Sequence, residues 1–173
     1  MIKNFILFSL PKHLIYLIPI FLVTGPFLSD LAVTLVSIIF IVLLLREKNF
    51  KIFKNKFYYI FFIFYLYLIL NSLSQNQNYD SLIISFTYIR FGLFSLAMTY
   101  FLSQDEKLIK KIFYSLLIIF VILIFDGSLQ YFTGKNILSW DLKYPGPRVS
   151  SLFGDELILG SFIARMLPVL IGL

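Results

Sequence analysis

The chain has 173 residues, of which 60% are hydrophobic, 19% are aromatic and only 14% are charged. This composition excludes an ordinary soluble domain, in which about 25% of the residues are charged. The net charge of +6 does not indicate nucleic-acid binding, because the basic residues form clusters beside apolar blocks, where orientation in a membrane explains them. We therefore predict an all-α membrane protein with no nucleic-acid partner.

The residue types available for metal sites are few. The sequence has no cysteine and one histidine, His13, which excludes disulfides, thiolate metal sites and multi-histidine motifs. We predict neither a metal nor a cofactor. The apolar run from Phe5 to Leu10 is interrupted by Pro11 and Lys12, so it is not typical of a secretory signal peptide.

Long apolar blocks separated by short polar stretches predict a polytopic transmembrane helical bundle that occupies residues 1–173 as a single domain. Gly25 and Pro26 break the first apolar region, so GPFLSD is predicted to be a turn between two spans. The first block is short, and it either begins before Leu14 or crosses the membrane only in part. About six spans are predicted, at residues 14–25, 30–45, 57–73, 81–102, 112–132 and 156–173, with a polar loop at 133–155.

Lysine and arginine are concentrated in alternate loops. One set of loops contains Lys3 and Lys12, the cluster from Arg46 to Lys56, and Lys107, Lys110 and Lys111. The other set has no basic residue in GPFLSD or SQNQNYD, and Lys135, Lys143 and Arg148 in the long loop. The positive-inside rule assigns the first set to the cytoplasm. We predict a multi-pass protein of the bacterial inner membrane with a cytoplasmic amino terminus and a periplasmic loop 133–155.

Polar residues inside apolar spans are the first candidates for function, because polarity is costly there. Arg90, Asp126 and Arg165 all fall in the outer half of the membrane, at ~1.5 Å of helix per residue. One interpretation is a buried pair of Arg90 and Asp126 that fixes helix packing. The other is an outward-facing cationic pocket that attracts an anion. Gln130 follows Asp126 by one helical turn and would line the same pocket.

Two acidic residues, Asp155 and Glu156, precede the last apolar block. Carboxylates are favourable at the amino-terminal end of a helix, where they accept hydrogen bonds from free N–H groups and oppose the helix dipole. We predict that they cap the last span, since too few other ligands converge here for a metal.

Arg148 follows the turn Tyr144-Pro145-Gly146-Pro147 in the predicted periplasmic loop, where the positive-inside rule gives a cation no orienting role. A guanidinium binds a phosphate through two parallel hydrogen bonds. Arg148 is therefore a candidate for binding a lipid diphosphate at the outer leaflet.

Asp126, Gln130 and Gly134, followed by PGPRVSSLFGDELILGSFIARMLPVL, resemble the O-antigen ligase family of polytopic membrane proteins, which includes O-antigen polymerases. The likeness centres on the stretch from Arg148 to Pro168, and VTGPFLSD and YIRFGLF resemble the first hairpin and fourth span of the family. It covers the whole chain as the amino-terminal part of such a protein. Ser151 departs from the pattern, because many members have glycine at that position.

The resemblance implies a metal-independent, GT-C-type membrane glycosyltransferase of lipopolysaccharide biosynthesis in the cell envelope. Such an enzyme transfers a glycan from undecaprenyl diphosphate to an acceptor sugar, usually on lipid A core, at the periplasmic face. The residue match makes Arg148 the diphosphate-binding candidate. The family's base is a histidine in a later periplasmic loop, so we expect no catalytic residue in these 173 residues and no glycan transfer by them alone.

Other functions stay open. In an O-antigen or polysaccharide polymerase of the same family, the acceptor would be another lipid-linked repeat, and the spans do not distinguish this case. A transporter or flippase for lipid-linked sugars would use Arg90, Asp126 and Arg165 as its translocation pathway. A purely structural membrane subunit would leave Arg148 without a role.

Overall fold

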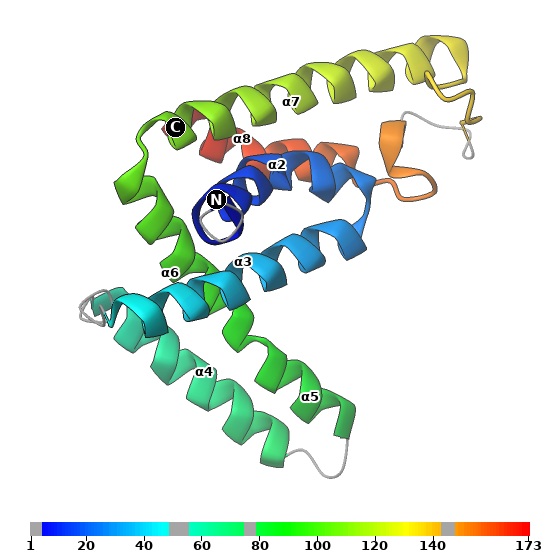
Figure 1. Cartoon of the computed structure of the whole chain (residues 1–173). Coiled ribbons are helices and arrows are strands. Elements are labelled where there is room, and N and C mark those ends of the chain that lie inside the picture. The colour runs from blue at the N-terminus through cyan, green and yellow to red at the C-terminus, as the bar shows by residue number, and fades with distance from the viewer. Residues whose placement is uncertain (1–4, 49–55, 75–78, 143–147) are drawn as a thin grey trace. The chain divides into compact units, whose positions relative to one another are not determined.

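A computed structural model gives the structure of the chain and describes residues 5–48, 56–74, 79–142 and 148–173. These residues are helical apart from their connections and one isolated bridge between Lys135 and Asp141, which confirms the all-α class. Within the described ranges, five helical segments are long and apolar enough to cross a membrane, as a multi-pass membrane protein requires. They are Phe5–Thr24, Pro26–Glu47, Lys56–Ser74, Tyr79–Gln104 and Lys107–Thr133 (Figure 1).

The chain divides into two compact units, which are described separately. The first unit comprises Met1–Ile15 and Leu31–Gln104, and the second comprises Tyr16–Asp30 and Asp105–Leu173. The connection that contains Arg148 belongs entirely to the second unit, together with the helices before and after it.

The first span begins at Phe5, before the predicted start at Leu14. A π-helical turn, η1 (Phe5–Ser9), leads directly into α2 (Leu10–Thr24). Pro11 has no N–H to donate to the preceding turn, and a wide turn just before it accommodates that loss. The combined segment of 20 residues is ~30 Å long, which matches the apolar thickness of a bilayer. The alternative of a partial crossing is therefore not needed.

The predicted turn GPFLSD is wrong, because only Gly25 separates α2 from α3 (Pro26–Glu47). Gly25 has a φ of 129°, which a residue with a side chain rarely adopts. Pro26 is the first residue of α3, a position where its missing N–H costs nothing. The remaining residues of the motif are helical because lipid penalises an open backbone.

The third span agrees with prediction as α4 (Lys56–Ser74), whereas the fourth is interrupted at Tyr88 between α5 (Tyr79–Thr87) and α6 (Ile89–Gln104). Side-chain hydroxyls supply donors beside the interruption. Tyr65 donates to the carbonyl of Phe86 at 3.3 Å, and Ser37 donates to the carbonyl of Arg90 at 3.0 Å. Such side-chain donors let an irregular backbone persist within an apolar segment.

The fifth span, α7 (Lys107–Thr133), begins five residues before its predicted start at 112 and therefore includes Lys107, Lys110 and Lys111 in its first turns. It ends at Gly134, which has a φ of 78° and donates its N–H to the carbonyl of Gln130. This is the left-handed glycine cap that commonly ends helices. Gln130 is therefore in the last turn of α7, at the end opposite the lysines.

The predicted sixth span is the shorter helix α8 (Leu159–Gly172), which has 14 residues. Its length of ~21 Å is less than the ~30 Å of a bilayer core. Figure 1 shows α8 beside α7, and a core of Val23, Ile119, Leu123 and Leu159 lies between them and α2. This packing places the connection between α7 and α8 over the last turns of α7.

Candidate functional site

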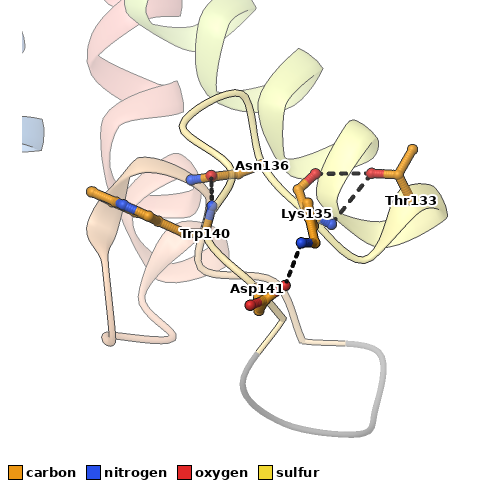
Figure 2. Close-up of polar contacts among 5 residues, drawn as sticks. All are labelled: Thr133, Lys135, Asn136, Trp140 and Asp141. Carbon is orange, nitrogen blue, oxygen red and sulfur yellow. Dashed lines mark hydrogen bonds and ion pairs between the residues drawn. The ribbon is translucent and has the colours of Figure 1, made fainter.

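The first part of the connection, Gly134 to Leu142, turns back on itself after α7. Asn136 donates its backbone N–H to the carbonyl of Trp140 at 3.1 Å, and its side-chain Oδ1 accepts the N–H of Trp140 at 2.8 Å. Lys135 and Asp141 form an exposed ion pair with 3.3 Å between Nζ and Oδ1. Figure 2 shows the side-chain bond of Asn136 to Trp140 and the ion pair of Lys135 with Asp141. An ion pair this exposed contributes little stability, so the hydrogen bonds of Asn136 define the turn.

Beneath this turn is a buried polar cluster, made of Asp126, Gln130, Asn136, Ser150 and Ser151. Asp126 is fully buried on α7 and uses both carboxyl oxygens. Oδ1 accepts the backbone N–H of Ile137 at 2.7 Å, and Oδ2 accepts the hydroxyl of Ser151 at 2.6 Å. One side chain of α7 therefore binds both the early and the late part of the connection.

Gln130 lies one turn after Asp126 on the same face of α7 and is also fully buried. Its Oε1 accepts the backbone N–H groups of Ser150 at 3.1 Å and Ser151 at 2.8 Å. The Nδ2 of Asn136 donates to the carbonyl of Ser151 at 3.0 Å. These bonds satisfy backbone groups that would otherwise be buried without partners, at a cost of about 1–3 kcal/mol each.

Ser151 lies at the centre of this cluster and has a left-handed backbone conformation, with a φ of 52°. A residue with a side chain adopts this conformation at a cost of about 1–3 kcal/mol. Ser151 is fully buried, and its N–H, its carbonyl and its hydroxyl all have partners in the cluster. The hydrogen bonds therefore offset the backbone strain and determine the direction of the chain next to Arg148.

Gly127, beside Asp126 on α7, lets the chain approach closely. A Cβ atom at this position would lie 2.7 Å from Cδ2 of Leu159 and 3.5 Å from Cγ2 of Val149. The first distance is shorter than real Cβ contacts allow. The absence of a side chain thus lets Leu159 of α8 pack closely on α7, whereas the distance to Val149 is an ordinary van der Waals contact.

Arg148 is exposed and precedes the buried Ser150 by two positions. Because Ser150 and Ser151 are bonded to Gln130, Arg148 is held near the last turn of α7. The rise from Lys111 to Gln130 along the helix is about 28 Å, close to the apolar thickness of a bilayer. Arg148 and the lysines therefore lie at opposite ends of α7. The turn Tyr144 to Pro147 lies outside the described residues.

Asp126 and Gln130, which were predicted to line a cationic pocket, are buried in the polar cluster of the second unit. In the described part of the second unit, the side chain of Asp126 is bonded to Ile137 and Ser151, and Arg165 is exposed on α8 without an ion pair to it. Each oxygen of the carboxyl group therefore accepts one hydrogen bond from the connection after α7.

Arg90 belongs to the first unit and is half-buried at the start of α6. Its guanidinium carbon lies 5.0 Å from the centre of the Phe91 ring, a favourable arrangement for a cation over an aromatic face. Its pairing with Asp126 stays a prediction.

The helix that Asp155 and Glu156 were predicted to cap starts later than expected. The amino-terminal cap position of α8 belongs to Ile158, which makes no side-chain cap hydrogen bond, and Asp155 and Glu156 are exposed before it. The backbone N–H of Glu156 instead bonds the carbonyl of Phe153, continuing the short 3-10 turn η3 (Ser151–Phe153). The helix starts later than predicted because this turn occupies the residues after Ser150.

Sequence reasoning did not identify Asn136, Ser150 and Ser151 as members of the site. The pair of serines that follows Arg148 and Val149 was the available signal, but their partner Gln130 lies 20 residues earlier in the sequence. Comparisons of the chain with protein-family models, with curated proteins and with solved structures find no match.

Proposed function

We propose that this protein is a GT-C-type membrane glycosyltransferase of the O-antigen ligase kind. It would transfer a glycan from undecaprenyl diphosphate to an acceptor sugar such as lipid A core, at the periplasmic face of the bacterial inner membrane. The observation that supports this best is the placement of exposed Arg148 by a buried polar cluster, at the end of α7 opposite Lys107, Lys110 and Lys111.

The chemistry of glycan transfer explains why an arginine at this position is useful. When an acceptor hydroxyl attacks the anomeric carbon, the bond from that carbon to the lipid diphosphate breaks, and negative charge develops on the departing phosphate. A guanidinium can donate two parallel hydrogen bonds to it. A donor that is already in position stabilises this charge without reorganisation during the reaction.

The polar cluster would provide that preorganisation. Asp126 and Gln130 project from a continuous helix and bind the chain just after Arg148 through buried hydrogen bonds. Sites built on rigid elements keep their geometry better than sites on loops. Asp126 and Gln130 are therefore positioning residues, in place of the pocket-lining role that the sequence suggested.

The backbone of Ser151 gives further support to the family resemblance. Position 151 is where many members of the resembled family carry glycine, and here it has a φ of 52°. Glycine adopts this conformation without strain. Serine is compatible with it in this chain because its hydroxyl donates to Asp126.

The test is Arg148→Ala in the native-length protein, with glycan-modified lipid and protein abundance measured together. We expect transfer to fall by about 10²-fold at normal abundance, the usual effect of removing one donor to developing charge. Arg148→Lys should recover only part of the loss, because an ammonium lacks the planar fork. Lys135→Ala is the control, an exposed cation of the same connection, and should retain nearly full transfer. Unchanged transfer by Arg148→Ala would refute the diphosphate role, and lower abundance alone would assign Arg148 a structural role.

A polymerase is the alternative that the same geometry supports, because it differs only in the acceptor. Supplying purified protein with either lipid A core or a second lipid-linked repeat would separate the two activities. A flippase has less support, because Asp126 is buried and hydrogen-bonded within the polar cluster of the second unit.

A further inference from the structure

A groove of about 380 Å³ lies between α2 and the first turns of α7, at the end of α7 opposite Arg148. Its lining residues all belong to the second unit. They are Tyr16, Ile20, Lys111, Tyr114, Ser115 and Ile118. None of them has a carboxylate, and Lys111 is their only charged member. The groove is therefore positively charged at one place and apolar over most of its remaining surface.

The polar and apolar parts of the groove are separated along the two helices. On α7, Lys111 precedes Ile118 by about two turns, a rise of about 10 Å. On α2, the ring of Tyr16 lies at the level of Lys111, because its centre is 5.8 Å from Nζ. The core that contains Val23 and Ile119 lies further along both helices. The apolar part of the groove thus leads from the basic end of α7 towards the middle of the span.

The positive charge of Lys111 is available to a ligand. Lys111 is exposed, and its contact with Tyr16 is within the ~6 Å of a favourable cation–π interaction. An aromatic ring orients the ammonium group but does not neutralise it, so N–H groups remain to donate to an anion. Lys107 lies one turn earlier on the same face of α7 and adds to the positive charge.

Ser115 provides a second polar group, one turn after Lys111 on the same face of α7. It is 7% exposed, and its hydroxyl has no hydrogen-bond partner within the described residues. A buried hydroxyl without a partner is destabilising and rare in native structures. A phosphate or ester oxygen that enters the groove would satisfy it.

We propose that this groove binds one anionic phospholipid, with its phosphate at Lys111, a glycerol ester oxygen at Ser115 and the start of an acyl chain along Ile20 and Ile118. A soluble phosphate would use the charge but leave the apolar part empty, whereas a phospholipid uses both. The positive-inside rule predicts that this end of α7 faces the cytoplasm, where anionic headgroups attract basic residues. The volume is at the lower end of small-molecule sites, so the rest of the lipid stays in the bilayer.

The experiment is photolabelling of the native-length protein in nanodiscs of phosphatidylcholine, which has no net charge. The probe is a trace of phosphatidylglycerol with a diazirine near the start of one acyl chain. Label should enter α2 and α7 beside the groove, and label spread evenly over all lipid-facing helices would overturn the proposal. In Lys111→Gln, labelling should fall about fivefold, or about 1 kcal/mol, the usual contribution of one basic residue beside anionic lipid.

Lys110→Gln is the matched control for charge. Lys110 is exposed on the same helix, is next to Lys111 and does not line the groove. Its labelling should stay within about twofold of the unmodified protein, because water and salt screen a charge outside the groove. Equal losses in Lys110→Gln and Lys111→Gln would show a general attraction to the basic end of α7 and would overturn the proposal.

Ile118→Phe tests the apolar part of the groove. The larger ring should occupy the space of the acyl chain and lower labelling by about threefold or more. Ile124→Phe is its control, because Ile124 is 52% exposed against 53% for Ile118 and does not line the groove. If both variants were labelled to the same extent, the acyl chain would not lie in this groove.

Competition identifies the source of the ligand. Excess unlabelled phosphatidylglycerol should suppress labelling of the groove, whereas excess phosphatidylethanolamine, which has no net charge, and soluble glycerol 3-phosphate should not. Equal competition by phosphatidylethanolamine would show a surface for bulk lipid, and equal competition by glycerol 3-phosphate would show a site for free phosphates. Either result would overturn the proposal. The groove and Arg148 are at opposite ends of α7, so neither result bears on the proposed glycan transfer.

Discussion

The interruption at Tyr88 and the connection after α7 both place irregular backbone beside apolar helices, but different groups satisfy them. At Tyr88, single hydroxyls of Tyr65 and Ser37 donate to carbonyls at 3.3 and 3.0 Å. After α7, Asp126 and Gln130 accept several buried donors, with distances from 2.6 to 3.1 Å. The connection after α7 therefore depends on a shared network, in which removing one side chain leaves several polar groups without partners.

The largest effect is expected from Asp126→Ala. It removes the acceptor of both the Ile137 N–H and the Ser151 hydroxyl, and each donor left buried costs about 1–3 kcal/mol. The free energy of unfolding in detergent should fall by at least about 2 kcal/mol. Asp126→Asn retains one acceptor oxygen and should lose less. If the free energy of unfolding fell no more than in an exposed variant such as Lys135→Ala, the shared network would not be what holds the connection after α7.

Two substitutions at Ser151 are expected to have an intermediate effect and separate backbone strain from hydrogen bonding. Ser151→Ala removes the donor to Asp126 but keeps a side chain at a φ of 52°, so it should lower the free energy of unfolding by about 1–3 kcal/mol. Ser151→Gly loses the same bond but relieves the strain. Thermal unfolding should therefore rank Ser151→Gly as more stable than Ser151→Ala, and the reverse order would show that the strain is unimportant.

The smallest effect is expected from Tyr65→Phe in the first unit. It removes a single 3.3 Å hydrogen bond to the carbonyl of Phe86 and keeps the aromatic ring, so the free energy of unfolding should fall by about 1 kcal/mol or less. A loss as large as that of Asp126→Ala would mean that the interruption at Tyr88 is also held by a network. Protein abundance in membranes, measured for both variants together, provides a second readout.

Much of the fold follows from local sequence. Apolar runs of sufficient length become helices in lipid because the backbone has no other partner there, and this places α4 at its predicted residues and α7 close to them. Local signals were less reliable at the boundaries. Gly25-Pro26 suggested a longer turn than the one residue that separates α2 from α3, and nothing in the run around Tyr88 indicated an interruption.

The candidate site shows where local sequence stops being sufficient. Asp126, Gln130 and Arg148 stood out as polar residues in or beside apolar segments, because their cost in lipid is a property of each residue alone. Their relationship was decided by tertiary structure. The partners of Asp126 and Gln130 lie in a connection that folds back over α7, and that path includes the left-handed backbone of Ser151. Hydrogen-bond partners are a property of which segments meet, so helix position alone placed Asp126 and Gln130 on one face but did not reveal the buried cluster that they form.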